Sequence, residues 1–322
     1  CGYTLAEAFD YRGWRAPGKG PLRVLDLGCG TGASSLAVLY YLRAWGIRNP
    51  IELDARDYSG KSLTFLRRIH REANHLWPDT RVLTERKNLR HLDDHTAKGG
   101  YDLILSSYAL NECWEGSEEK ERADTIIHLG NLLKDSGYML LIEPAEGEVC
   151  RSLHGASARA VKENDRLFIQ APYFNSMPCP LWQTESKYFS HEVRPCTPPQ
   201  KVDQINQRLN LEIREVKFGM SILSRVRPRA LPEKSGMFRI ISPVRKRKGT
   251  LSLWGLGVDG IEREYEWQRR NLPKEDQKLI LSLQRGDLID CTGNPEQLVN
   301  RARLKKLEDL SPMFVPRWKE SI

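Results

Sequence analysis

The stretch at residues 24–32, Val-Leu-Asp-Leu-Gly-Cys-Gly-Thr-Gly, joins an apolar run to three glycines. Gly28, Gly30 and Gly32 remove side chains where the backbone must turn sharply and approach a ligand. Residues 33–45 then have the pattern of a helix that packs on the preceding strand. A strand that ends in a glycine loop and continues as a helix is typical of a nucleotide cofactor site.

The spacing of these glycines separates two kinds of cofactor site. A dinucleotide site usually has the spacing G-x-G-x-x-G after an apolar strand end. Here the spacing is G-x-G-x-G, and the acidic Asp26 lies two residues before the first glycine. This arrangement resembles motif I of the class I methyltransferases that use S-adenosylmethionine (SAM); an ordinary strand-to-helix turn is the alternative. The resemblance implies a SAM site that includes Asp26, Gly28, Cys29, Gly30 and Gly32.

Two further strands are expected to bring polar residues to the same site. Residues 51–58 predict a second strand that ends near Asp57, where an acidic side chain can accept hydrogen bonds from both ribose hydroxyls. Asp54 is a nearby alternative. A short third strand follows, and the loop after it offers Glu85 or Asn88 for contact with adenine.

The fourth and fifth predicted strands define the reaction zone. Residues 101–107 (YDLILSS) and 137–144 (GYMLLIEP) are apolar runs, as expected of buried strands in a parallel sheet. In open α/β sheets the ligand lies outside the carboxyl ends of the strands. We assign Ser107 at this edge to the cofactor. The candidate catalytic residues beside it are Tyr108, Asn111, Glu112 and Glu143.

The chemistry expected of these residues is methyl transfer, an in-line displacement at a sulfonium. The protein must mainly hold the acceptor and the methyl carbon in line and exclude water, and no metal ion is required. An acceptor that carries a proton needs a base, and Glu112 or Glu143 is placed to serve. Tyr108 is placed to stack on a base or on adenine. Helix capping is the alternative role for Asn111 and Glu112.

Length and cysteine content set the broad class of protein. The 322 residues are enough for about two domains, and no apolar run approaches the length of a membrane span. Seven scattered cysteines, an odd number, favour reduced thiols. We therefore expect a soluble protein of the cytoplasm, or of the mitochondrial matrix if the source is eukaryotic.

The net charge of +8 is concentrated in one segment. Residues 225–248 hold nine basic residues and one acidic residue, and Phe238 lies among them, with Trp254 just beyond. A basic stripe with aromatic residues is typical of an RNA partner, and a solvated basic turn is the alternative. The sequence predicts a hairpin tip that projects the candidate RNA-binding residues Arg245, Lys246, Arg247 and Lys248.

Further motifs resemble a specific family, the methyltransferase-like proteins associated with the small ribosomal subunit, known chiefly from mitochondria and also present in bacteria. The resemblance implies a SAM-binding Rossmann-like core, a cysteine-bearing insertion after strand five, and action on or beside small-subunit ribosomal RNA. It is carried by the order and spacing of residues 107–112, 142–144, 159, 170–172, 178–181, 189–190, 216–225 and 245–249.

The chain departs from this family at the cysteines. Members similar to it carry an iron-sulfur cluster on four cysteines, the first three spaced C-x5-C-x7-C. Only Cys179 remains here, and the other positions hold Tyr173, Lys187 and Trp254. We therefore predict that the protein holds no iron-sulfur cluster and no metal ion. A residual metal site formed by Cys179, His191 and Cys196 is a minor alternative. The side chains expected to pack in place of the cluster are Tyr173, Trp182, Tyr188 and Phe189.

The expected organisation is an α/β protein with a Rossmann-like sheet and a small β/α extension. The boundaries are a SAM-binding core at 1–149, an aromatic and proline-rich insertion at 150–200 that forms a lid or an acceptor wall, the remaining sheet strands with the basic hairpin at 201–260, and a charged helical extension at 261–322. Two classes of function compete. The first is a SAM-dependent methyltransferase that yields S-adenosylhomocysteine, with ribosomal RNA, a small molecule or a protein as acceptor. The second is a silent SAM-binding factor in ribosome assembly.

Overall fold

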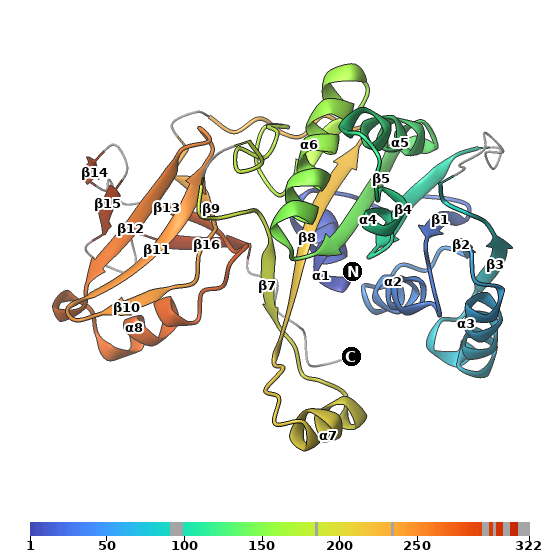
Figure 1. The fold of residues 1–322 in the computed structure, drawn as a ribbon, viewed down its shortest axis with the longest axis horizontal. Helices are drawn as coiled ribbons and strands as arrows, with labels where there is room; N and C mark the ends of the chain where they lie inside the picture. The colour runs from blue at the N-terminus through green and yellow to red at the C-terminus, as the bar shows by residue number, and fades with distance from the viewer. Residues whose placement is uncertain are drawn as a thin grey trace.

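The protein contains two β-sheets side by side, and helices cover both faces of the first sheet (Figure 1). The structure is a computed structural model. It describes residues 1–90, 99–183, 186–232, 235–291, 296–298, 301–304 and 310–314.

The first sheet has the strand order β3-β2-β1-β4-β5-β8-β6, and β7 pairs with the start of β8. Strands β3, β2, β1, β4 and β5 are parallel, whereas β8 runs antiparallel between β5 and β6. The carboxyl ends of β1, β2, β4 and β5 therefore lie at one edge. The strands are β1 (Leu22–Leu27), β2 (Ile51–Asp57), β3 (Thr80–Arg86), β4 (Tyr101–Ser107), β5 (Leu133–Pro144), β6 (Phe168–Ala171), β7 (Glu192–Pro195) and β8 (Glu215–Ser224).

Each face of this sheet has its own apolar core. One core joins the sheet to α1 (Gly2–Ala6), the π-helical turn η1 (Glu7–Tyr11), α2 (Ala33–Ala44) and α3 (Gly60–Glu72). The other joins it to α4 (Leu110–Cys113), α5 (Glu119–Asn131) and α6 (Gly147–Glu163). The helices bury residues at helical spacing, as Leu63 and Leu66 do in α3. A short 3-10 turn, η2 (Asn74–Leu76), follows α3. No helix among the described residues is long and apolar enough to cross a membrane.

The chain after β5 differs from the predicted insertion at 150–200. Helix α6 packs on α5, and β6 pairs with β8, so both belong to the layers of the first sheet. The segment from Pro172 to His191, which we call the surplus chain, has neither helical nor strand periodicity. Its described residues form turns as far as His191, followed by β7 and by helix α7 (Gln200–Arg208), which projects from the body in Figure 1.

The second sheet is larger than the expected extension, and its order is β14-β15-β12-β11-β9-β13-β16, with β10 paired to β11. Its apolar core includes Phe238, Leu253 and Trp267. The helices beside it are η3 (Arg269–Asn271) and α8 (Lys274–Leu281). The strands are β9 (Met237–Ile240), β10 (Arg245–Arg247), β11 (Thr250–Gly257), β12 (Glu262–Gln268), β13 (Leu288–Cys291), β14 (Glu296–Leu298), β15 (Arg301–Leu304) and β16 (Leu310–Phe314).

The prediction of a charged helical extension at 261–322 is wrong for much of its described part. Residues 262–268 form β12 and residues 301–304 form β15, and only α8 is a helix of more than one turn there. In β12 the charged residues alternate with Tyr265 and Trp267, which are buried. This period of two is that of a strand, whereas the alternating charges suggested a solvated helix. Of the remaining sheet strands expected at 201–260, β8 belongs to the first sheet, whereas β9, β10 and β11 belong to the second.

A buried network of ion pairs joins the two sheets. The Arg239 side chain on β9 donates hydrogen bonds to both carboxylate oxygens of Glu7 at 2.8 and 2.9 Å and to Glu192 Oε1 on β7 at 2.9 and 3.1 Å. Arg194 on β7 in turn pairs with Glu192 at 2.6 Å and with Asp287 at 2.5 Å. All five side chains are almost fully buried. The network thus fixes the N-terminal turn and β7 against the second sheet.

Candidate functional site

The predicted glycine loop lies between β1 and α2, at the carboxyl edge of the first sheet. A Cβ atom on Gly28 would come within 2.2 Å of the Ala109 Cβ, so the loop packs closely on the chain after β4. Gly30 has a φ of +53° and nothing within 4 Å of where its Cβ would be. The loop is therefore closely packed at Gly28 and open at Gly30, as a ligand cradle requires. Gly32 ends the loop as the N-cap of α2, and Cys29 is buried within it.

Asp26 stands at the end of β1 and is completely buried. Its Oδ2 accepts hydrogen bonds from the hydroxyls of Ser34 at 2.7 Å and Ser35 at 2.5 Å, both in the first turn of α2. Its Oδ1 has no hydrogen-bond partner. Burial raises the pKa of Asp26 to about 6, although the two serines oppose this shift. The Asp26 Oδ1 atom is thus a buried acceptor without a donor, which is suited to a cationic ligand group. The two serine partners of Oδ2 could not be predicted from the sequence.

Asp57, the predicted ribose contact, lies beside the open part of the loop at the end of β2. Its Oδ2 accepts the Gly30 N–H at 2.8 Å, and its Oδ1 accepts the Ser59 N–H at 2.8 Å. Each oxygen retains a lone pair, so the fixed carboxylate can still accept hydroxyl groups. The alternative, Asp54, pairs with Arg56 at 2.8 Å and accepts the Tyr101 hydroxyl. The adjacent Tyr58, which sequence reasoning missed, is 70% exposed.

The expected adenine side is less closely organised. Asn88 is exposed after β3, and its Oδ1 accepts the Arg90 N–H at 3.0 Å. The alternative residue, Glu85, pairs instead with Arg56 at 3.3 Å. Leu89 lies next to the glycine loop, since its Cδ1 would be 3.5 Å from a Cβ on Gly28. The structure therefore places Leu89 against the glycine loop, whereas the Asn88 side chain contacts Arg90.

The chain after β4 forms the other wall of the site. Ser107 is half-buried at the end of β4. Tyr108 has a φ of +59°, in the left-handed region that side chains rarely adopt, and it is 46% exposed. Its hydroxyl donates to the Lys217 carbonyl at the start of β8 at 3.2 Å. Tyr108 thus lies exposed at the carboxyl edge of the first sheet, and such backbone strain is common at functional sites.

Glu143 and Glu112, the two candidate bases, lie in different surroundings. Glu143 is fully buried, and its Oε1 accepts the Leu110 N–H at 3.1 Å while Oε2 has no partner. Burial raises the pKa of Glu143 to about 8, although hydrogen bonds from the Asn111 and Leu110 N–H groups oppose this. Glu112 is exposed in α4. The N-cap of α4 is Ala109, so neither Asn111 nor Glu112 is the capping residue.

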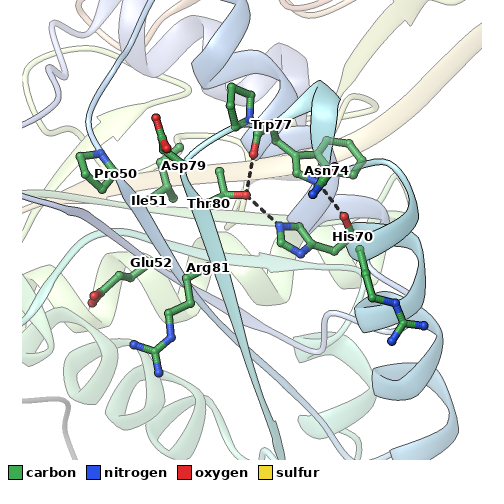
Figure 2. Close-up of a pocket in the computed structure, with 11 residues that line it drawn as sticks. Pro50, Ile51, Glu52, His70, Asn74, Trp77, Asp79, Thr80 and Arg81 are labelled. Carbon is green, nitrogen blue, oxygen red and sulfur yellow. Dashed lines mark hydrogen bonds between the residues drawn. The ribbon is translucent and has the colours of Figure 1, made fainter.

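Two of the cavities among the described residues lie near the first sheet. One of about 470 Å³ lies at the amino ends of β2 and β3, the edge opposite the glycine loop (Figure 2). Its polar groups bond one another: Thr80 donates to the Trp77 carbonyl at 2.8 Å, and a His70 ring nitrogen is 2.8 Å from the Thr80 hydroxyl. The other, of about 570 Å³, is lined by Leu89 and Leu110 beside the predicted site.

The basic hairpin belongs to the second sheet. Arg245–Arg247 form β10, which pairs with β11, and Lys248 and Gly249 make the turn. Lys246, Arg247 and Lys248 are exposed, as a nucleic-acid contact requires. Two members of the predicted stripe do not reach the surface. Arg239 is consumed in the buried network and Phe238 is fully buried in the core, so neither can contact RNA.

An iron-sulfur cluster does not fit the positions that the resemblance suggests. Tyr173 and Cys179 are buried in one apolar group with Trp254, and Lys187 lies over the Trp254 ring. The only thiolate ligand of the four would be Cys179. Of the aromatic side chains expected to pack there, Tyr173, Trp182 and Tyr188 do so, whereas Phe189 contacts His191 instead. The described residues hold no group of three His, Cys, Asp or Glu placed to bind a metal.

The strand order, the antiparallel β8 and the glycine loop define the Rossmann-like fold of class I SAM-dependent methyltransferases. Within this fold the chain belongs to the family described as mitochondrial small ribosomal subunit Rsm22, whose sequence profile matches residues 5–260.

Several solved and curated proteins resemble parts of this chain. TehB from Haemophilus influenzae is 16% identical with a TM-score of 0.37, over 71% of this chain and 62% of TehB. A TehB-like SAM-dependent methyltransferase from Corynebacterium glutamicum is 14% identical with a TM-score of 0.34, over 69% and 86% of the two chains. The polyketide synthase PksR of Bacillus subtilis is 31% identical over 125 residues, 38% of this chain but 4% of the synthase. No activity follows from these likenesses.

Proposed function

We propose that this protein is a SAM-dependent methyltransferase that acts on, or while bound to, the RNA of the small ribosomal subunit. The observation that carries the proposal is the glycine loop, which is open at Gly30 and has the fixed Asp57 carboxylate beside it. The family name supports a ribosomal setting, and the exposed hairpin supports an RNA partner.

The residues of the loop fit SAM. The missing side chain of Gly30 leaves room for the ligand, and the Asp57 carboxylate, already oriented by two N–H groups, can accept the ribose hydroxyls. The unpaired Asp26 Oδ1 matches the cationic amino group of the methionyl part. When bound, SAM supplies a methyl group on a sulfonium centre.

On the acceptor side the chain offers a wall and a proton acceptor. Tyr108 presents an exposed ring at the end of β4. Glu143, behind it, has a pKa of about 8, because burial disfavours its ionised form. An ionised Glu143 can take the proton that an amino or hydroxyl acceptor loses after methylation. Activity that depends on this group should rise with pH through about 8.

The test is transfer of a labelled methyl group from SAM into small ribosomal subunits, their free RNA, and the protein and small-molecule fractions of an extract. We expect label in the RNA with the wild type and with Gly46→Ala. We expect none with Gly30→Ala. The two glycines are matched, since both have a positive φ and an open Cβ position, but Gly46 lies at the far end of α2. Label confined to protein or to small molecules would contradict the RNA acceptor.

A second candidate is a catalytically silent SAM-binding factor of ribosome assembly. It is favoured by the complete burial of Glu143, whose Oε1 already binds the backbone of α4. SAM binding without label in any fraction would favour this candidate over an enzyme.

A further inference from the structure

Tyr188 brings together cations from three distant parts of the sequence. The Lys187 Nζ lies 5.2 Å from the centre of the Tyr188 ring and 5.1 Å from that of Trp254 on β11. Arg245 on β10 donates to the Tyr188 hydroxyl at 3.2 Å. The guanidinium of Arg285 lies 5.6 Å from the same ring. Three positive charges thus surround one buried tyrosine at the junction of the surplus chain and the second sheet.

Lys187 and Arg245 lack carboxylate partners within the part of the chain that the structure describes, whereas Arg285 interacts electrostatically with Glu192. No ion pair joins Lys187, Arg245 or Arg285 to a described aspartate or glutamate, and Arg285 contacts His191 instead. Glu264 and Glu266 on β12 lie opposite Trp254 and Ser252 on β11, and each has an interaction of its own. Aromatic faces attract a cation but leave its net charge in place.

Like charges held close together repel, so this arrangement is stabilised when an anion binds between them. Lys187 is exposed and Arg245 half-exposed, so both are open to solvent, whereas Arg285 is mostly buried behind them. Beyond Arg245 the positive charge continues along the same hairpin through Lys246, Arg247 and Lys248. A row of cations that starts at an aromatic pair and follows a hairpin fits a chain of phosphates better than a single anion.

We propose that Lys187 and Arg245, held by Tyr188 and Trp254, form the first phosphate site of an RNA-binding surface that continues along the hairpin Arg245–Arg247. The inference rests on the RNA partner of the proposed function but is independent of methyl transfer. It adds Lys187, Tyr188 and Trp254 to the interface that the hairpin alone suggested.

The test measures binding of a fluorescein-labelled single-stranded RNA of about 12 nucleotides by anisotropy over a range of salt concentrations, without SAM. We expect Lys187→Ala to weaken binding about 5-fold at low salt and to reduce the slope of log K against log salt by about 0.7, the loss of one phosphate contact. Tyr188→Phe keeps the ring but removes the hydroxyl that holds Arg245, and it should weaken binding less.

The matched control is Lys61→Ala, an exposed lysine in α3 on the other sheet. Circular dichroism checks that each variant is folded. Wild-type affinity and an unchanged salt slope for Lys187→Ala would overturn the proposal, as would an equal loss for Lys61→Ala. Inorganic phosphate added as competitor should displace RNA only weakly; if it competes as tightly as unlabelled RNA, the site is one for a free anion. If the wild type bound RNA but transferred no methyl group, that result would overturn the proposed function and leave this inference standing.

Discussion

Replacing Arg239 with methionine should strongly destabilise the protein. Arg239 makes four hydrogen bonds to Glu7 and Glu192 and a fifth to the Pro172 carbonyl at 2.7 Å, with its side chain 2% exposed. Methionine fills similar volume but leaves Glu7 with Arg12 alone and Glu192 with Arg194 alone as a buried cationic partner. Removal of one partner from a buried ion pair costs about 3–5 kcal/mol. Because Arg12 still contacts Glu7 at 3.1 Å, we expect a loss near 3 kcal/mol.

The loss should depend on pH in a defined direction. In the wild type, burial opposes ionisation of Glu7, but Arg239 and Arg12 outweigh it and lower its pKa. The stabilisation from this carboxylate is therefore present above its unfolded pKa and is lost as pH falls through the folded value. Without Arg239 burial dominates, so the pKa of Glu7 rises and the variant loses stability as pH rises. The difference between wild type and variant should be smaller at pH 5 than at pH 8.

Urea unfolding followed by circular dichroism at both pH values measures this difference. The control is Arg68→Met, which breaks an exposed pair with Glu72 in α3 and should leave the unfolding midpoint unchanged. A loss below about 1 kcal/mol for Arg239→Met, or a difference that grows toward acid pH, would refute the assigned role of the network.

Three further predictions concern single sites. The raised pKa of Glu143 costs the wild type stability as pH rises from 5 to 8, so the Glu143→Gln variant should become more stable relative to the wild type over this range. A difference in the free energy of unfolding that stays constant from pH 5 to 8 would contradict this. Gly286→Ala should destabilise the protein by about 2 kcal/mol or more, since φ is +95° and the Cβ would lie 1.7 Å from a Glu192 oxygen; an unchanged melting temperature would contradict it. Burial raises the pKa of the Cys29 thiol, and it raises the pKa of Cys150 and Cys179 to about 12. Iodoacetamide should therefore label these three thiols only in denaturant. Labelling of any of them in the native protein, detected by mass spectrometry, would contradict this.

The first sheet was predictable where its strands are largely apolar runs, as in β1, β4 and β5. The predicted fourth strand, 101–107, has the observed bounds, and the second strand ends at Asp57 as expected. The second sheet was harder to predict because its strands are charged on one face. In β12 the Glu and Arg residues resemble a solvated helix unless the burial of Trp267 is known.

The candidate site was predictable only as far as single motifs reach. The local spacing of the glycines and of Asp57 predicts a cofactor loop. In the structure the Gly30 N–H donates to the Asp57 carboxylate. The burial of Glu143 and of Arg239 depends on contacts between distant segments, such as the pairing of β9 with β11 and β13. Lys187 carries no motif at all, and its position over Trp254 appears only when the chain is folded.

The central claim is that the loop at Gly30 is a SAM site. The most direct measurement is calorimetric titration of SAM into the wild type, Gly30→Ala and Gly46→Ala. The structure predicts binding by the wild type and by Gly46→Ala, and a loss of at least about 10-fold for Gly30→Ala, because its Cβ would enter the open space and adopt an unfavourable φ. Equal affinities for all three proteins, or no SAM binding by the wild type, would contradict the claim.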